Sequence, residues 1–264
     1  VHNCSRCIIA GGCIMVSYER MTKILDILSK RKMISTVQLE ALMYCSTSTL
    51  RRDLIQLEKD GKIIRTHGEV RLVTTNNVEY TYESRKQEET SGKKHIAETA
   101  STFLTDNQSI FIDSSSTAAM LIPYLANLQN LRVITNGLEI ARQLNSYDNI
   151  TLFFCGGHID YGTNSALGDF AIHFINNFHA DICFMSCRGL DRFGSYEANY
   201  NQALLKQQMI ANSDLTVLLA DSSKFHTSHY FKLANYNVID YIITNEAPVD
   251  SFQDTVSKQC EILW

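Results

Sequence analysis

The sequence predicts an α/β protein in two parts, in which a small helical unit with a basic hairpin precedes an open, mostly parallel α/β sheet. Two observations predict this class. Residues 18–59 carry apolar side chains at the spacing of amphipathic helices. From residue 93 onward, short apolar strands alternate with loops and helices, which is typical of a parallel sheet covered by helices.

Composition limits the possible classes of function. The chain has 264 residues, of which 45% are hydrophobic and 20% charged, as in globular proteins of one or two domains. No apolar run approaches the ~20 residues that span a bilayer, so we expect no membrane contact and a cytoplasmic location. The net charge is −4, yet residues 18–72 hold eleven lysines and arginines against seven acidic residues. A basic segment on an acidic body is typical of a module that binds a polyanion.

Residues 1–17 match neither part and are expected to lie outside the fold. They lack the positive start and cleavage pattern of a signal peptide, and Met15 precedes a polar, helix-starting stretch. Residues 1–14 are therefore interpreted as an upstream extension of the reading frame or an artefact. Cys4 and Cys7 have the spacing that begins some zinc sites, but no second pair accompanies them. We therefore expect the eight cysteines to be reduced and expect no metal site.

The first part, residues 18–73, predicts a winged helix-turn-helix domain. Ser35 is a suitable N-cap for its second helix, and Gly61 suits the left-handed residue that ends its third. A basic strand follows, then a turn at Thr66-His67-Gly68 and a returning strand. The expected elements are helices over residues 18–31, 36–44 and 47–59 and strands over residues 62–65 and 70–73.

The third helix is the candidate reader of DNA. Leu50, Leu54 and Leu57 line one of its faces, so Arg51 and Arg52 fall on another. Arginine suits the paired acceptors of guanine in the major groove, and basic hairpin residues suit phosphate or the minor groove. The alternative is an ordinary amphipathic helix with a solvated charged face. The residues expected to contact DNA are Ser46, Ser48, Thr49, Arg51, Arg52, Lys62, Arg65, His67 and Arg71.

The second part begins after a polar, turn-rich stretch. Residues 74–92 predict a linker, and residues 93–264 predict the second domain. In an open parallel sheet, ligands bind beyond the carboxyl ends of the strands, and polar residues gather at those ends here. The expected strands cover residues 109–112, 131–134, 150–155, 182–186, 215–220 and 239–244, and the expected helices cover residues 93–104, 118–125, 138–144 and 198–212.

The loop Asp113–Thr117 carries four consecutive hydroxyl residues before a helix start. Hydroxyls and backbone N–H groups there suit a phosphate; the alternative is a helix cap that binds nothing. Lys224 follows a later strand and could pair with the same anion, whereas Lys206 is interpreted as a surface lysine. Thr135-Asn136 and Gly156-Gly157 stand at the ends of the next two expected strands and complete one candidate pocket. Its residues are Asp113, Ser114, Ser115, Ser116, Thr117, Thr135, Asn136, Gly156, Gly157 and Lys224.

Several motifs carry a family resemblance. They are Leu50–Leu54, Leu57-Glu58, Gly61 and Arg65–Gly68 in the first part, and Lys94–Ala97, Ile112–Ser114 with Ser116-Thr117, Ile134–Asn136, Gly156-Gly157, Arg188–Asp191 and Asp221–Phe225 in the second. From residue 18 to about residue 246, the order and spacing of these motifs resemble the DeoR family of bacterial transcriptional regulators. The second part resembles the sugar-phosphate-sensing domain of that family.

This resemblance implies a repressor of a carbohydrate-utilisation operon that binds double-stranded operator DNA and is released by a phosphorylated sugar. We expect a homodimer or homotetramer, because one small module makes a limited footprint on DNA. The second domain would resemble ribose-5-phosphate isomerase and glucosamine-6-phosphate deaminase in fold, without catalytic residues or a cofactor. By the same likeness, Ser114–Thr117 and Lys224 would hold the phosphate, while Asp113, Thr135 and Asn136 would lie beside the sugar.

Some positions depart from the pattern of the family. Ser115 stands where a glycine is usual, and Glu69 stands where the hairpin usually has a second glycine. Gln202 or Ala203 stands where a glutamate is common, a few residues before Lys206. These departures bear on which effector is bound and how strongly.

Two alternatives to an effector-controlled regulator remain. One is a sugar-phosphate isomerase or deaminase with an added DNA-binding module, for which Asp113, Asp221 and Glu197 are the candidate acid and base residues. None of them stands in a recognisable catalytic motif. The other is a regulator that binds DNA but senses nothing, which Ser115 would be consistent with.

Overall fold

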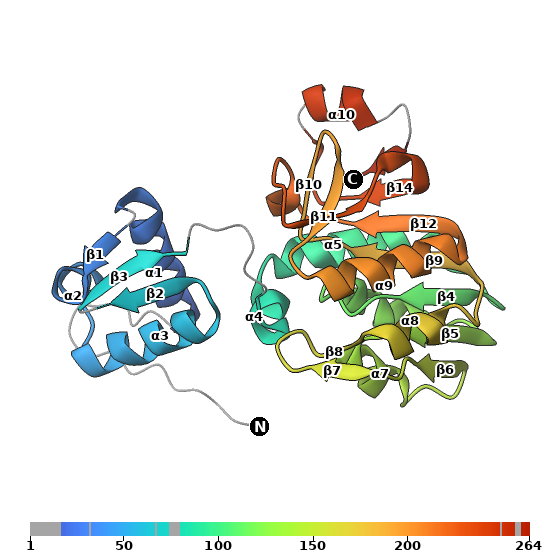
Figure 1. Cartoon of the computed structure of the whole chain (residues 1–264), viewed down its shortest axis with the longest axis horizontal. Coiled ribbons are helices and arrows are strands. Elements are labelled where there is room, and N and C mark those ends of the chain that lie inside the picture. The colour runs from blue at the N-terminus through green and yellow to red at the C-terminus, as the bar shows by residue number, and fades with distance from the viewer. Residues whose placement is uncertain (1–16, 32, 67, 74–79, 249, 257–259) are drawn as a thin grey trace. The chain divides into compact units, whose positions relative to one another are not determined.

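The chain divides into two compact units, Val1–Thr75 and Asn76–Trp264, and each is described by itself (Figure 1). The computed structural model describes residues 17–31, 33–66, 68–73, 80–248, 250–256 and 260–264. The expected extension at residues 1–17 lies outside this range except for Ser17, which begins the first helix. None of the described helices is long and apolar enough to cross a membrane.

The N-terminal unit combines three helices with a small antiparallel sheet, which confirms the winged helix-turn-helix that the sequence predicts. The sequence does not predict strand β1, which is three residues long and pairs with β3. The sheet order is β1-β3-β2. The elements are α1 (Ser17–Arg31), β1 (Met33–Ser35), α2 (Thr36–Met43), α3 (Thr47–Lys59), β2 (Ile63–Thr66) and β3 (Glu69–Leu72).

Local sequence determines where these helices begin and end. Ser35 Oγ accepts a hydrogen bond from Gln38 N (3.1 Å), and Gln38 Oε1 accepts one from Ser35 N (3.3 Å), so α2 begins with a capping box. Ser46 Oγ accepts a hydrogen bond from Thr49 N (3.3 Å) and caps α3. Just after α3, Gly61 has φ +68°, a left-handed conformation that glycine adopts without strain.

Helix α3 is anchored by its apolar face and by one buried ion pair. Leu50, Leu54 and Leu57 are each 2% exposed and belong to the core of the N-terminal unit. Asp53 is buried on the same side, and Arg20 of α1 donates to both of its oxygens, from Nε at 2.7 Å and from Nη2 at 3.1 Å. This pair joins α1 to α3 and leaves the opposite side of α3 in solvent.

The C-terminal unit is built on a sheet in which the described strands lie in the order β15-β14-β12-β9-β4-β5-β6. Every pairing between these seven strands is parallel, which confirms the fold class that the sequence predicts. The strands are β4 (Ser109–Ile112), β5 (Leu131–Thr135), β6 (Ile150–Phe154), β9 (Ala180–Ser186), β12 (Ser213–Leu219), β14 (Tyr241–Ile243) and β15 (Glu261–Leu263).

Helices cover both faces of this sheet (Figure 1). Helices α8 and α9 contribute to the core on one face, and α5, η1, α6 and α7 to the core on the other. The helices are α4 (Tyr82–Gln87), α5 (Thr90–Ser101), η1 (Ala118–Leu121), α6 (Ile122–Leu125), α7 (Leu138–Leu144), α8 (Asp169–Ile175), α9 (Tyr200–Ala211), η2 (Ser222–Lys224), η3 (Tyr236–Val238) and α10 (Asp250–Val256), where η marks a 3-10 helix.

Short strands of the C-terminal unit outside the main sheet form two further small sheets that the sequence does not predict. They are the hairpin β7 (His158–Asp160) with β8 (Ser165–Leu167), and a three-stranded sheet of β10 (Gly189–Asp191), β11 (Gly194–Glu197) and β13 (Phe231–Ala234). Strands this short carry too few residues for an alternating pattern to be recognised. Strand β11 ends at Glu197 and places this side chain beside the pocket described below.

The strand order creates a crevice at one point of the sheet. The chain runs from β4 outward to β5 and β6, and then returns to place β9 on the other side of β4. Loops that leave β4 and β9 at their carboxyl ends therefore turn away from each other. Ligands of open α/β sheets bind at such a switch point, so the loops after Ile112 and Ser186 are positioned to line a site.

Part of the expected linker is helical. Helix α4 and the start of α5 lie within residues 74–92, of which residues 74–79 fall outside the described part of the chain. Tyr82 is 3% exposed, and its backbone N donates to Gly162 O at 2.8 Å. The segment is polar and charged, and among its described residues Tyr82 is the one large apolar side chain that is buried, so its composition predicts a loop.

Candidate functional site

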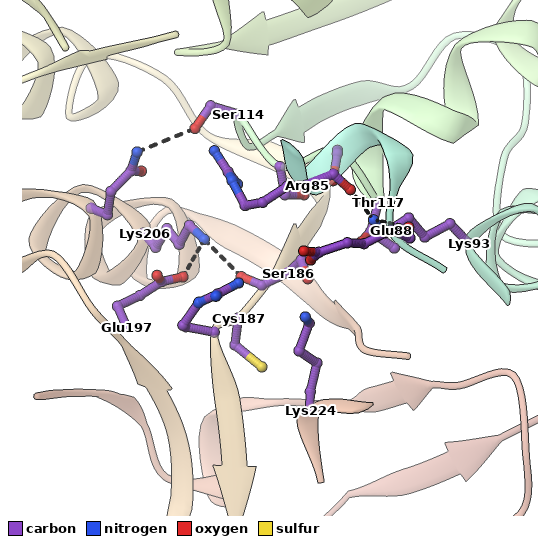
Figure 2. A pocket seen from close by; sticks show the side chains of 14 residues that line it. Arg85, Glu88, Lys93, Ser114, Thr117, Ser186, Cys187, Glu197, Lys206 and Lys224 are labelled. Atoms are coloured by element: carbon purple, nitrogen blue, oxygen red, sulfur yellow. Dashed lines mark hydrogen bonds and ion pairs between the residues drawn. The ribbon is translucent and has the colours of Figure 1, made fainter. Parts of the chain in front are cut away.

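A pocket lies where the sheet topology predicts one, at the carboxyl ends of β4 and β9 (Figure 2). Its empty volume is about 480 Å³, counted to its open mouth. Hydroxyl and charged side chains dominate its walls. It is lined by Arg85, Glu88, Lys93, Ser114, Ser115, Ser116, Thr117, Ser186, Cys187, Arg188, Glu197, Gln202, Lys206 and Lys224.

The loop after β4 is shaped by its own side chains. Asp113 Oδ1 accepts hydrogen bonds from Ser115 N (3.1 Å) and Ser115 Oγ (2.5 Å), and Ser115 Oγ accepts one from Ala118 N (3.1 Å). These bonds leave the hydroxyls of Ser116 and Thr117 at the pocket wall. Asp113 is fully buried and does not line the pocket, in contrast to its expected place beside a ligand, because its carboxylate holds the loop and Lys206.

Lys206 lies at the base of the pocket, and its interpretation as a surface lysine is wrong. It is 5% exposed, and its Nζ contacts Asp113 Oδ2 (2.8 Å), Ser186 O (2.7 Å) and a carboxylate oxygen of Glu197 (Figure 2). Three partners use the three N–H donors of an ammonium. Burial opposes its charge, but the two carboxylates outweigh burial and raise the pKa of Lys206.

Cations that line the rest of the pocket are less completely paired. Arg85 Nη2 and Arg188 Nε are buried, and neither has a hydrogen-bond partner among the described residues. Lys224 is paired only loosely, with its Nζ 3.9 Å from Asp221 Oδ2. Lys93 is buried, and its Nζ donates to the backbone oxygens of Glu88 (2.6 Å) and Arg85. Such unsatisfied donors suit an anion with several oxygen atoms.

The remaining predicted ligand residues lie away from the pocket wall. Thr135 and Asn136 are buried at the end of β5, where Thr135 Oγ1 accepts from Gly137 N (3.0 Å) and Asn136 Nδ2 donates to Ala166 O (3.3 Å). Gly156 and Gly157 follow β6, which is an edge strand. They do not reach the pocket because β6 lies two strands away from β4.

Many pocket residues are absent from the sequence-based prediction. For Ser186, Cys187 and Arg188 a signal existed, because they follow a predicted strand at the same edge of the sheet as Asp113. Arg85 and Glu88 come from the expected linker, and Lys93 comes from the expected helix over residues 93–104. The rest come from β11 and from the inner side of α9, and no local pattern marks any of these as pocket residues. The residues missed are Arg85, Glu88, Lys93, Ser186, Cys187, Arg188, Glu197, Gln202 and Lys206.

The pocket offers little of the chemistry that an enzyme would need. Asp113 and Glu197, two of the three candidate acid and base residues, share the buried ammonium of Lys206. Burial raises the pKa of Cys187 to about 12, so this thiol is neutral at physiological pH. Within the described ranges, no three His, Cys, Asp or Glu side chains gather in a way that could hold a metal ion.

The predicted DNA-contact residues divide between α3 and the hairpin. Ser46, Ser48, Arg51 and Arg52 are exposed, and Thr49 is partly exposed. This places two arginines and several hydroxyls at the solvent side of α3, opposite its leucines. A helix that presents donors near its N-terminus in this way can enter a major groove.

The hairpin carries the remaining predicted DNA-contact residues. Arg71 is exposed and Lys62 partly exposed. Arg65 is partly exposed and pairs with Glu58 of α3, with 3.6 Å between Arg65 Nη1 and Glu58 Oε2. His67 lies outside the described residues. The hairpin is therefore joined to α3 through Arg65.

Comparisons with known proteins agree with both halves of this description. The family model of the DeoR C terminal sensor domain matches residues 88–246, and that of the DeoR-like helix-turn-helix domain matches residues 20–76. The uncharacterized HTH-type transcriptional regulator YulB of Bacillus subtilis is 32% identical, over 92% of this chain and 96% of its own length. The glycerol-3-phosphate regulon repressor of Escherichia coli K12 is 27% identical, over 89% of this chain and 93% of its own.

Among solved structures, ribose 5 phosphate isomerase A from Neisseria gonorrhoeae is 16% identical, with a TM-score of 0.38 over 51% of this chain and 53% of that one. A likeness at this level carries no argument about function. The matched family models, in contrast, describe a DNA-binding and a sensor domain, and the relatives named above are regulators. The enzyme alternative is therefore not favoured. The chain is a DNA-binding transcriptional regulator and belongs to the DeoR family.

Proposed function

We propose that this protein is a cytoplasmic repressor of a carbohydrate-utilisation operon that leaves its operator when a phosphorylated sugar occupies the C-terminal pocket. The single observation that carries the proposal is the set of incompletely paired cations at the switch point of the sheet. The relative that is a glycerol-3-phosphate regulon repressor supports an effector that carries a phosphate. On DNA, the protein acts as a homodimer or homotetramer that reads repeated half-sites.

The phosphate of the effector binds at the hydroxyls of Ser116 and Thr117, with Lys224 and the two arginines around it. Lys224 and Arg85 both extend toward this space (Figure 2). Asp113 and Ser115 support the loop rather than touch the ligand, because their polar atoms are occupied within it. Ser115 therefore has a structural role at the position where the family usually has glycine.

On DNA, Ser46, Ser48, Thr49, Arg51 and Arg52 of α3 enter the major groove. Arg71 and Lys62 of the hairpin contact phosphate, together with Arg65 and His67. Exposure of both arginines of α3 supports this assignment, since no described residue holds their guanidinium groups in the interior of the unit.

Effector binding reaches the DNA-binding unit through the segment before α5. Arg85 belongs to α4, which follows the boundary between the units, and its Nε donates to Tyr80 O (3.2 Å). The guanidinium of Arg188 lies over the ring of Tyr80, 4.1 Å from its centroid. An anion that draws on both arginines therefore changes how Tyr80 is held. A coupling of about 1–3 kcal/mol would change operator affinity by roughly 5- to 150-fold.

A thermal-shift screen of the purified protein against phosphorylated sugars tests the proposal. A ligand present at about 100 times its Kd stabilises the folded state by about 2.7 kcal/mol, and we expect one of these sugars to raise Tm by about 5 °C or more. The unphosphorylated sugars serve as controls. If no phosphorylated sugar and no inorganic phosphate shifts Tm, the protein binds DNA but senses nothing of this class.

Lys224→Ala is expected to leave operator binding intact but to prevent release by the effector, because the variant lacks one of the pocket cations. Electrophoretic mobility shifts with and without the sugar phosphate from the screen measure both properties. Lys232→Ala, which removes an exposed lysine of β13 outside the pocket wall, is the matched control. Release of Lys224→Ala at the wild-type effector concentration would show that Lys224 is not a ligand.

A further inference from the structure

The pocket has a wall that carries no charge. Gln202 of α9 is 4% exposed and lines the pocket next to Ser114. Its Nε2 donates to Ser165 Oγ at 2.7 Å and approaches Ser114 Oγ at 3.5 Å. Ser165 Oγ in turn donates to Ser114 Oγ at 2.7 Å. Two serine hydroxyls and one amide thus form a connected polar surface.

The amide of Gln202 has an orientation that its partners determine. The single hydroxyl proton of Ser165 has two acceptors in reach, Ser114 Oγ and Thr163 O (3.2 Å). Ser165 Oγ therefore receives its hydrogen bond from the amide, so the nitrogen of Gln202 faces Ser165. The oxygen Oε1 is then left buried without a partner among the described residues. An unsatisfied buried acceptor is destabilising and marks a site where a donor is missing.

The acceptor Oε1 and the cations of the pocket suit different parts of one ligand. Lys206 beside it has its three donors engaged, so it does not satisfy Oε1. Arg85, Arg188 and Lys224 suit the anionic end of a ligand, whereas Gln202 Oε1 needs a hydrogen-bond donor, such as a sugar hydroxyl. A glutamate, common near this position in the family, would bring a negative charge that glutamine does not.

We propose that Gln202 determines effector specificity by accepting, at Oε1, a hydrogen bond from a hydroxyl group on the sugar end of the phosphorylated ligand. This rests on the proposed function, since it assumes that the phosphate occupies the cationic part of the same pocket. The ligand class is a sugar or polyol phosphate with a free hydroxyl in reach of α9. Inorganic phosphate satisfies the cations and leaves Oε1 unpaired.

The test compares Gln202→Met with the wild-type protein by isothermal titration calorimetry. The probes are inorganic phosphate and the best ligand among glucose 6-phosphate, fructose 6-phosphate and glycerol 3-phosphate. Methionine matches glutamine in length but lacks the acceptor, so we expect about ten-fold weaker binding of the sugar or polyol phosphate. Inorganic phosphate should bind within about two-fold of wild type. The matched control is Gln208→Met, the same substitution on the same helix outside the pocket wall.

Each outcome separates the inference from the proposed function. Equal losses for both probes, or no loss for either, would overturn the role of Gln202 while the effector pocket stands. Wild-type protein that binds inorganic phosphate as tightly as every organic phosphate would also overturn it. Failure to bind any probe would reject the proposed function itself.

A second measurement uses deoxy analogues of the best ligand. In the wild-type protein, replacing one hydroxyl of the best ligand by hydrogen should weaken binding by about ten-fold at one ring or chain position. Gln202→Met should bind that deoxy analogue and its parent with equal affinity, because the acceptor is gone. Additive losses from the deoxy analogue and the variant would contradict a direct hydrogen bond.

Discussion

The two functional regions of this protein place their charged side chains in opposite ways. In α3, Arg51 and Arg52 are exposed, and the buried Asp53 is paired with Arg20 of another helix. In the pocket, most charged groups are wholly or partly buried, and Lys206 is enclosed by two carboxylates and a carbonyl oxygen. The two arginines proposed to read DNA are therefore separate from the residues that hold α3 in place, whereas in the pocket the residues proposed to bind ligand lie beside or overlap with those that hold the fold.

A substitution therefore has a single expected effect on α3 but two expected effects in the pocket. A change at the solvent side of α3 removes a contact and leaves the leucine core intact. A change at the base of the pocket removes support from the loop after β4 as well as a wall of the site.

Lys206→Met should destabilise the C-terminal unit by about 3–5 kcal/mol, because it leaves the carboxylates of Asp113 and Glu197 buried without a counter-charge. Urea unfolding followed by the fluorescence of Trp264, the single tryptophan of the chain, measures the loss. Lys224→Met removes a side chain that is 16% exposed and forms only a loose ion pair, with 3.9 Å between Lys224 Nζ and Asp221 Oδ2, so it should change stability by no more than about 1 kcal/mol. Similar small losses in both variants would contradict the structural role of Lys206.

The double variant Arg51→Ala and Arg52→Ala should bind DNA about 100-fold more weakly, because each arginine that pairs with a base contributes about 1–3 kcal/mol. Fluorescence anisotropy with DNA selected by the wild-type protein from a random pool provides the measurement. The thermal midpoint should remain within about 1–2 °C of wild type, since both side chains are exposed. Lys59→Ala, on the same helix, is the control. Unchanged DNA affinity would reject α3 as the recognition helix.

The affinity of the pocket for a sugar phosphate should fall as pH rises from 7.5 to 9. Burial lowers the pKa of Lys93 to about 8, so the free pocket loses this positive charge in that range, while the phosphate stays dianionic. A bound anion favours the protonated lysine, so affinity is highest below pH 8. We expect about a five-fold loss, measured by calorimetry in buffers of equal ionic strength. Lys93→Met should bind the sugar phosphate more weakly, and its affinity should not change between pH 7.5 and 9. If the affinity of this variant still falls over that range, a group other than Lys93 is responsible.

The ease of prediction from sequence also differs between the two regions. The N-terminal unit could be predicted closely, because its caps and leucine spacing are local signals within a few residues of one another. Ser35 caps the helix that it is expected to cap. Ser46, which is predicted only as a DNA-contact residue, also caps a helix. The missing element is β1, which exists only because β3 lies beside it.

The pocket could be predicted only in part. Ligands of open α/β sheets bind beyond the carboxyl ends of the strands, and this rule needs only the positions of the strands. It correctly selects the loop Ser114–Thr117 and Lys224 as pocket residues. The rule fails for Gly156 and Gly157, because it does not say which strands flank the switch point. Lys206 could not be predicted, since its partners are brought to it by β4 and β11 rather than by its own helix.

The central claim is that effector binding in the pocket and operator binding by α3 are coupled. Its most direct test is a reciprocal titration in which DNA affinity is measured with and without saturating sugar phosphate, and sugar-phosphate affinity with and without saturating DNA. Thermodynamic linkage requires the same factor in both directions, and we predict a loss of roughly 5- to 150-fold in each. A sugar phosphate that binds the pocket tightly and leaves DNA affinity unchanged would contradict the claim.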